Sequence, residues 1–489
     1  MKDKLPSFFG IARRNTEDER VTKLPARRAA VRRSDRLRLA ARCVAVVLAS
    51  AALVMFVTSL NARGEVMPAA LDPRIAALVT QVSAQRLQAS DNRLVGFGTR
   101  NLFSERLGSR VRGVLPARDW IAGQFRAISK RSGERLTVAF DDYVQPKTPR
   151  TPRDVLVSSV IATLPGDDPS RGSIVISSHF DSRNSEGNDE TRDAPGADDN
   201  GSGTAAVIEA ARVLARTHFP ATLVFACFDG EEQGLFGSDH FARTLAARGS
   251  RVEANLNNDI IGTSYAHDGA QTPGLARLFS EALPAGAVPA GVNALGSEND
   301  SPSRELARAV IEIDRAYVPS MKIESIYRSD RFLRGGDQES FSEQRFPAVR
   351  FVEAHENFDH QHQNVRVENG VQYGDLSRFM DFEYLARMTQ LNVAALAALG
   401  TAPAAPQAQM LNRELGYDTT LQWKPVPGAA AYELLWRATS EPMWTQVRNV
   451  GNVTSATLKG VSKDDWIVGV RALDAAGHAS VAAYPEPLR

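Results

Sequence analysis

Cysteine is almost absent from this chain of 489 residues, which contains only Cys43 and Cys227. Two cysteines cannot build a disulfide framework, and they are too few for a thiolate zinc site. Both lie in apolar runs, and we do not expect them to pair. Any metal ion in this protein must therefore be bound by oxygen and imidazole ligands.

An excess of charge of one sign is also missing over the chain as a whole, because 58 Lys and Arg residues face 57 Asp and Glu residues. The basic residues are concentrated at the N-terminus. Residues 1–42 hold 13 Lys and Arg against 5 Asp and Glu, a local charge of +8 that leaves −7 for the rest. Such a local excess does not indicate binding to nucleic acid, and no nucleic-acid partner is expected.

Residues 43–60, CVAVVLASAALVMFVTSL, form an apolar run of 18 residues without a charge. This length is at the lower end of what spans a bilayer as a helix. Three arginines crowd its N-terminal side, which predicts a basic cytoplasmic tail (1–42), a transmembrane anchor (43–60) and an exported remainder, periplasmic if the source is bacterial. A cleaved signal peptide is the alternative, although about 40 preceding residues make it a long one. A buried core helix is disfavoured by the basic flank.

The length of the chain predicts two folded domains, the first over residues 62–400. After a leading segment to about residue 150 with helical patterns, short runs rich in Val and Ile alternate with helical patterns. The strand-like runs are DVLVSSVIATL, GSIVISSHF, ATLVFACF, NLNNDIIG, MKIESIY and FPAVRFVE. This alternation predicts an α/β fold with a mixed, largely parallel central sheet flanked by helices. In such sheets the chemistry is found at the carboxyl ends of the strands.

The C-terminal part of the chain differs in kind from the rest. Residues 401–410 are rich in Pro and Ala without an amphipathic period, which indicates a linker. Residues 411–489 contain four of the five tryptophans, together with alternating runs such as AYELLWRA and WIVGVRAL. This pattern predicts an all-β sandwich, and the segment resembles a fibronectin type III domain. Its expected role is either that of a spacer or contact with a surface or polymer.

Polar motifs that could carry chemistry each follow an apolar strand. They are SSHFDS, GADDNGSG, FDGEEQGLFGS, NNDIIG and, far downstream, ENFDHQHQNVR. His179 and Asp181 are two residues apart on an extended segment, so one can bind a metal ion while the other supports the site. Glu231 and Glu232 can divide the tasks of a metal hydrolase, in which one carboxylate holds the ion and another takes a proton from water.

With Asp259 and a histidine from HQH, the set comprises two imidazoles, three coordinating carboxylates and one spare carboxylate. Three negative charges against two zinc ions leave +1, which a bridging hydroxide would neutralise. The sequence thus predicts a cofactor of two zinc ions.

These motifs resemble those of the co-catalytic zinc aminopeptidases related to bacterial leucyl aminopeptidase and glutamate carboxypeptidase (clan MH). The resemblance covers about residues 85–400, through LVGFGTRN, SSHFDS, APGADDNGSG, DGEEQGLFGS and NND. It implies that Asp199 bridges both ions, and that the peptide between Asp199 and Asn200 is cis. Asp198 is then a neighbour of the ligand and not a ligand itself.

The same resemblance distributes the remaining roles. It implies that Glu232 and a downstream histidine complete one zinc site, while His179 and Asp259 complete the other. Glu231 is then the general base, and Asp181 supports the metal-bound imidazole of His179. The downstream histidine is His362 or His360. In the family the last histidine ligand commonly stands in a QHTxxD pattern. The segment QHQNVR of this chain aligns His362 with that histidine, so His362 is the preferred ligand.

The resulting expectation is a membrane-anchored zinc exopeptidase. We expect an aminopeptidase that removes N-terminal residues from peptides by means of a zinc-bound hydroxide, with Glu231 as general base. A carboxypeptidase or a glutaminyl cyclase on the same fold is an alternative, and the latter typically has one zinc ion. A catalytically silent ectodomain that binds a partner is another. The expected partners are a peptide substrate and, through one N-terminal helix, the membrane.

Overall fold

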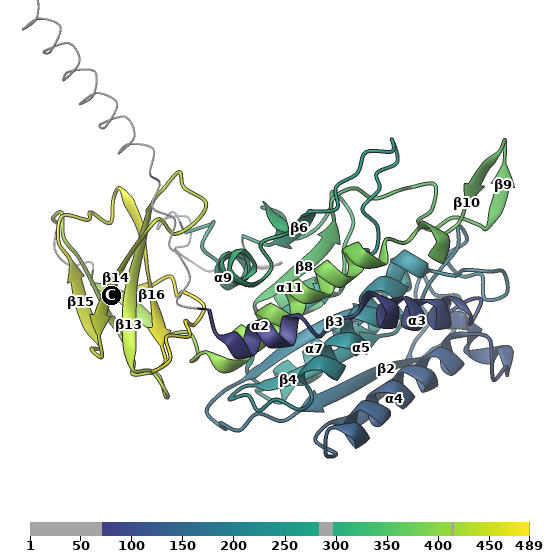
Figure 1. Cartoon of the computed structure of the whole chain (residues 1–489), viewed down its shortest axis with the longest axis horizontal. Coiled ribbons are helices and arrows are strands. Elements are labelled where there is room, and N and C mark those ends of the chain that lie inside the picture. Colours follow the sequence, from purple (N-terminus) through teal and green to yellow (C-terminus); the bar gives the residue numbers. More distant parts are fainter. Residues whose placement is uncertain (1–70, 283–296, 412–414, 489) are drawn as a thin grey trace, which may run out of the picture. The chain divides into compact units, whose positions relative to one another are not determined.

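A mixed sheet of eight strands forms the centre of the larger domain in the computed structural model, which describes residues 71–282, 297–411 and 415–488 (Figure 1). The strand order is β1–β2–β4–β3–β5–β8–β6–β7. The central strands β4, β3, β5 and β8 are parallel, whereas β1 and β2 pair antiparallel and β6 runs antiparallel to β8. The bounds are β1 (Thr137–Gln145), β2 (Val155–Leu164), β3 (Ser173–His179), β4 (Thr222–Phe228), β5 (Val252–Asn258), β6 (Leu275–Ser280), β7 (Lys322–Ile326) and β8 (Ala348–Glu353). The predicted α/β fold is confirmed.

Helices cover both faces of this sheet (Figure 1). One face packs against α3 (Ala84–Val95), α4 (Val114–Arg131), α5 (Gly203–Leu214), α9 (Pro302–Tyr317) and α11 (Phe382–Thr401), through a large core of Val, Leu, Ile, Ala and Phe side chains. The other face packs against α7 (Phe236–Ala247) and α10 (Asp337–Glu343). Because both faces are covered, the central strands β3, β4, β5 and β8 are buried along almost their whole length, including polar residues of β5 and β8.

The helical pattern at residues 73–88 is divided between two helices, α2 (Pro73–Val79) and α3. Asp72 caps α2 by accepting a hydrogen bond from the backbone N–H of Arg74, and Pro73 occupies the first turn, where its missing N–H costs nothing. Ser83 caps α3 by accepting from the backbone N–H of Arg86. Capping residues therefore define two separate helix starts inside one apolar pattern.

The parallel strands bring the chemical motifs to one edge of the sheet. His179 is the last residue of β3, and Asp259 directly follows β5. The short helix α6 (Glu231–Gly234) begins three residues after the end of β4. Since neighbouring parallel strands end at the same edge, residues far apart in the sequence meet there.

The C-terminal part consists of two β-sheets that enclose a core of their own. One sheet has the order β15–β12–β11–β17 and the other β14–β13–β16. The bounds are β11 (Ala408–Leu411), β12 (Thr419–Trp423), β13 (Ala431–Ala438), β14 (Gln446–Gly451), β15 (Ser455–Leu458), β16 (Trp466–Leu473) and β17 (Glu486–Leu488). Leu421, Trp423, Tyr432, Leu434 and Val468 fill the space between the sheets. An all-β domain is therefore present, and its likeness to fibronectin type III stays a prediction.

Strand β13 is buried on both of its faces. Tyr432 and Leu434 face the sandwich core, as alternation predicts, but Leu435 and Arg437 are buried as well. The guanidinium of Arg437 pairs with Asp300, and the indole N–H of Trp444 donates to Glu305 at 3.0 Å. These contacts join the sandwich to α9 and the loop before it, within one compact unit.

Several elements differ from the expected list. Strands β1 and β6 were not among the predicted strands, and β11 begins at Ala408, inside the segment expected to be a linker. Residues 366–373 form a small hairpin of β9 (Arg366–Glu368) and β10 (Val371–Tyr373).

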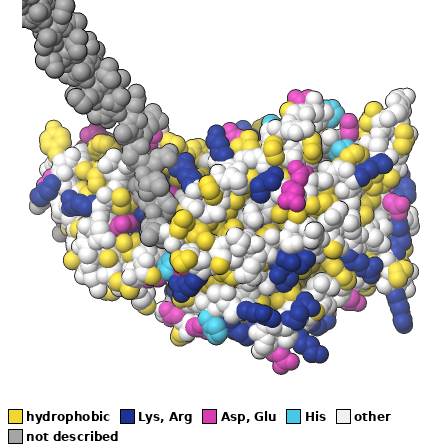
Figure 2. Space-filling model, viewed as in Figure 1, with side chains coloured by type: hydrophobic (Ala, Val, Ile, Leu, Met, Phe, Trp, Pro, Cys, Tyr) yellow, Lys and Arg dark blue, Asp and Glu magenta, His cyan; other side chains and the backbone are white. Residues whose placement is uncertain are grey.

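The predicted tail and anchor, residues 1–42 and 43–60, lie outside the described residues. Among the residues that are described, no helix has the length and apolar character needed to cross a membrane. Basic and acidic side chains are both scattered over the face seen in Figure 2.

Candidate active site

Asp199 lies between two imidazoles that come from distant parts of the chain. Its Oδ1 is 3.3 Å from Nε2 of His179, and its Oδ2 is 2.8 Å from Nε2 of His362. The amide of Gln361 also donates to Oδ2, at 3.1 Å. One carboxylate therefore presents one oxygen to each histidine, which is the arrangement that a shared ligand of two ions requires.

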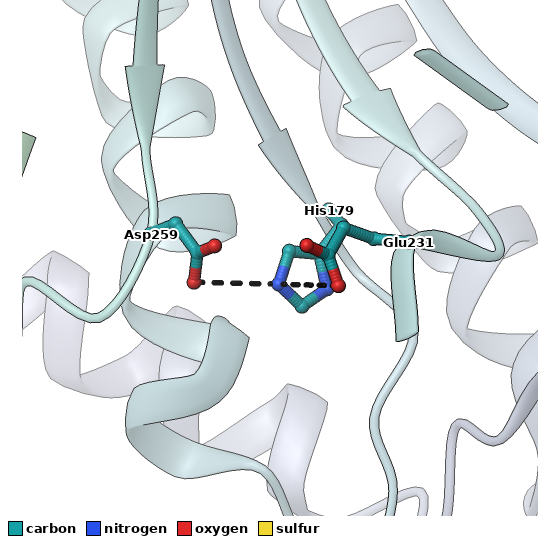
Figure 3. Close-up of side chains that lie close together, drawn as sticks. All are labelled: His179, Glu231 and Asp259. Carbon is teal, nitrogen blue, oxygen red and sulfur yellow. Dashed lines mark hydrogen bonds and ion pairs between the residues drawn. The ribbon is translucent and has the colours of Figure 1, made fainter. Parts of the chain in front are cut away.

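Asp259 and Glu231 complete the surroundings of His179 (Figure 3). The Nε2 atom of His179 is 3.4 Å from Oδ1 of Asp259 and 4.0 Å from Oε2 of Glu231. Figure 3 shows the carboxylates of Asp259 and Glu231 both close to the imidazole of His179; Asp259 directly follows β5, and Glu231 is the first residue of α6. The side chain of His179 is almost fully buried, whereas that of Glu231 is 12% exposed.

Glu232 belongs to the second histidine. Its Oε2 lies 3.0 Å from Nε2 of His362. The side chain of His362 is 29% exposed, whereas that of Glu232 is 4% exposed. Adjacent glutamates thus point to different histidines, because they occupy successive positions at the start of α6.

Asp181 ties the two halves of the site together. Its Oδ1 is 3.4 Å from Nδ1 of His179, on the side of the ring that faces away from Asp199. The same carboxylate accepts hydrogen bonds from the backbone N–H groups of Glu231 and Glu232, both at 3.2 Å. Asp181 therefore positions an imidazole and the start of α6 at once.

Asp375 holds the turn that carries Asp199. Its carboxylate accepts hydrogen bonds from the backbone N–H groups of Asp198 at 2.9 Å and of Asp199 at 2.8 Å. The peptide between Asp199 and Asn200 is cis, as the family resemblance implied. The Asn200 amide donates to the backbone carbonyl of Asn258 at 2.8 Å, which connects this turn to the end of β5.

The charges of the site are strongly coupled. Burial disfavours a charged imidazole, but Glu232 and Asp199 together raise the pKa of His362 to about 10. Burial likewise disfavours the ionised form of Asp199, yet the two histidines hold its pKa well below the usual range. Burial, reinforced by neighbouring carboxylates, raises the pKa of Glu231 well above its usual range. Without metal ions, protons on the imidazoles balance the carboxylates, and metal binding must release these protons.

The donor atoms fit zinc. Two groups of three residues have ligand atoms within 4.8 Å of one another: His179, Glu231 and Asp259, and Asp199, Glu232 and His362. Each group combines one imidazole nitrogen with carboxylate oxygens, a donor set that zinc accepts. Asp199 stands close to both groups and links them.

His360 lies apart from this cluster. Its ring stacks on Phe379, with 3.7 Å between the ring centroids and an interplanar angle of 12°. Burial lowers its pKa. Of the two histidines that the sequence left open, the structure brings only His362 to Asp199 and Glu232.

Two arginines close to the cluster were missed in the sequence. Arg100 is fully buried and donates hydrogen bonds to the carbonyls of Phe180 at 2.6 Å and Gly196 at 2.8 Å, so it fixes the segments on both sides of the site. Arg350 on β8 is also fully buried, and its Nη2 lies 2.9 Å from Oδ2 of Asp259. A charge inside the apolar run FPAVRFVE was the available signal for Arg350.

Comparison with known proteins now identifies the family. The sequence model described as peptidase family M28 matches residues 159–381, a range that contains every residue of the cluster. A probable zinc metalloprotease of Leptosphaeria maculans is 42% identical over 430 residues, which cover 87% of this chain and 99% of that protein. The chain belongs to peptidase family M28. It is a zinc metallopeptidase.

Other relatives agree with this assignment. A probable zinc metalloprotease of Pyricularia oryzae is 40% identical over 444 residues, which cover 87% of each chain. Among solved structures, LapA of Legionella pneumophila has a TM-score of 0.51 at 20% identity, covering 69% of this chain and 78% of that one. At this identity the likeness shows the zinc aminopeptidase fold alone.

Proposed function

We propose that this M28 peptidase is an aminopeptidase that removes N-terminal residues from peptides with a pair of zinc ions. The observation that carries the proposal is the position of Asp199, whose two oxygens face His179 and His362 at 3.3 and 2.8 Å. His179 and Asp259 would hold one ion, and His362 and Glu232 the other. Asp199 would hold both.

Glu231 has the position of a general base. It is next to the donor atoms, at 4.0 Å from Nε2 of His179, and it is partly open to solvent. When bound, the zinc ions would polarise the scissile carbonyl and make water more acidic. Glu231 would accept the proton of that water and pass it to the leaving amine. Asp181 would keep both the imidazole of His179 and the backbone of Glu231 in place while this occurs.

A panel of peptides tests the proposal. We expect hydrolysis of peptides with a free N-terminus, none of the same peptides after N-acetylation, and loss of the activity with a zinc chelator. Continued cleavage of acetylated peptides with release of the C-terminal residue would establish a carboxypeptidase instead. Cyclisation of an N-terminal glutaminyl peptide without hydrolysis would establish a glutaminyl cyclase, and no turnover of any of these peptides would favour a silent ectodomain.

We further propose that residues 43–60 anchor the protein in the cell membrane with residues 1–42 in the cytoplasm. The support is the uncharged apolar run and its basic flank. The full chain is expected in the membrane fraction after a high-salt wash, and a variant that lacks residues 1–60 in the soluble fraction. If expression of the full chain yields a shortened, soluble protein, the segment is cleaved instead.

A further inference from the structure

Arg350 connects Asp259 to a loop on the far side of β8. The Nη2 atom of Arg350 lies 2.9 Å from Oδ2 of Asp259, and Nη1 donates to Oδ2 of Asp330 at 2.6 Å and to the carbonyl of Gly335 at 3.0 Å. The arginine side chain is completely buried, and those of Asp259 and Asp330 are at most 3% exposed. A guanidinium in such a place requires partners, and these two carboxylates supply them.

The register of the sheet creates this contact. Arg350 on β8 lies opposite Asn257 on the parallel strand β5. Asp259 follows two residues later, and residues two apart along an extended segment project to the same face. The long arginine side chain therefore reaches forward to the carboxylate beyond the end of β5.

The contact leaves Asp259 with one oxygen for a metal ion. Its Oδ2 faces Arg350, whereas its Oδ1 faces Nε2 of His179 at 3.4 Å. Asp330 pairs with Arg331 as well, at 2.9 Å, and Asp259 keeps its Oδ1 for an ion. Glu232, the carboxylate beside His362, has no comparable partner. Arg183 lies 3.7 Å from it, but the side chain of Arg183 is 27% exposed.

We infer that Arg350 is a positioning residue that holds Asp259 as a one-oxygen ligand and thereby sets the affinity of the zinc ion bound by His179 and Asp259. This inference rests on the zinc centre proposed above. Residues that orient a metal ligand from behind typically change metal affinity about 10- to 100-fold when they are removed. Arg350 acts on Asp259 in this way, with Asp330 as its own support.

The test measures zinc affinity by competition with a chromophoric chelator. The double variant Arg350→Met/Asp330→Asn removes the guanidinium without leaving Asp330 as a buried charge. We expect one of its two zinc ions to bind about 10- to 100-fold more weakly than in the wild type, and the other to bind unchanged. Asp330→Asn alone is the matched control, and it should keep wild-type affinity for both ions because Arg350 still contacts Asp259.

Cobalt substitution gives a readout that a merely structural role would not change. If Asp259 gains the freedom to use both oxygens, the coordination number rises and the visible absorption of Co²⁺ at that site weakens. We expect this loss of intensity in the double variant and not in Asp330→Asn. Arg350→Lys, whose ammonium can contact Asp259 alone, should recover most of the zinc affinity. If the double variant does not fold, Arg350→Met alone, in which Arg331 still pairs with Asp330, should show the same weakening of one zinc ion.

The outcomes separate this inference from the proposed function. Wild-type protein that binds no zinc would overturn the zinc centre itself. Two ions in the wild type, bound with equal affinity and an equal Co²⁺ spectrum in the double variant, would overturn only the role of Arg350. Equal weakening in a folded Arg350→Lys variant would also overturn positioning by this charge pair.

Discussion

Changing Glu231 to Gln is expected to lower kcat for peptides with a free N-terminus by about 10²- to 10⁴-fold, the range typical for a general acid–base group. Glutamine keeps the shape of the side chain but cannot accept the proton of a water molecule at neutral pH. Glu231 lies beside the donor atoms, 4.0 Å from Nε2 of His179, and is not one of the proposed ligands. The variant should therefore keep its zinc ions. Steady-state kinetics and zinc analysis of the same preparation check both halves of this expectation.

Glu232 offers a matched comparison, because it is the adjacent residue with the same side chain. Changing Glu232 to Gln should lower activity through loss of zinc, and excess zinc should restore part of it. Zinc should restore nothing in Glu231→Gln, which already contains its ions. Release of one zinc ion from Glu231→Gln would contradict the assignment and make Glu231 a ligand, as its distance from the ligand atoms of His179 and Asp259 permits.

Central strands such as β3 and β4 could be predicted from the sequence because burial on both faces gives them continuous apolar runs. Runs such as GSIVISSHF and ATLVFACF coincide with β3 and β4 to within two residues at either end. The prediction that the chemical motifs meet at the carboxyl ends of these strands was therefore right as well. The same logic explains why His179 and Asp259, at the ends of strands, were found by inspection.

Strands β1 and β6 could not be recognised in the same way. Strand β1 lies at the edge of the sheet and none of its side chains is fully buried, so TVAFDDYVQ mixes four polar with five apolar residues. Strand β6 is short and antiparallel to β8, and its sequence LARLFS fits a helix equally well. In both cases tertiary pairing, not local preference, decides the structure.

The charged residues that hold the candidate ligands in place, Asp375 and Arg350, do so through contacts between distant segments of the chain. Asp375 reaches the backbone of Asp198 and Asp199 across 177 and 176 residues, and no spacing rule predicts such a contact. Arg350 meets Asp259 only because β8 pairs with β5 in one particular register. Family resemblance implied which residues are candidate zinc ligands, but it said nothing about these supports.

Changing Asp199 to Asn is expected to remove both zinc ions from the protein and, with them, the activity. Asparagine has one carbonyl oxygen in place of two charged ones, so it cannot face His179 and His362 at once. Both ions depend on this residue. The affinity for each ion should therefore fall by more than the factor of about 10 to 100 that is typical when a residue behind a metal ligand is changed. Zinc analysis after dialysis checks this, and an Asp199→Asn protein that keeps two ions would refute the bridging role.

Two histidine variants complete the comparison. His362→Ala should lose one ion, whereas His360→Ala should keep both, since the His360 ring stacks on Phe379 and lies apart from the carboxylates. The opposite pattern would make His360 the last ligand. Thermal unfolding gives an independent measure, because an ion that binds only the folded state adds about 2.7 kcal/mol of stability at a free concentration of 100 times Kd. Zinc should therefore raise Tm in the wild type and in His360→Ala by similar amounts, and should have little effect on Asp199→Asn, in which neither ion retains its shared ligand.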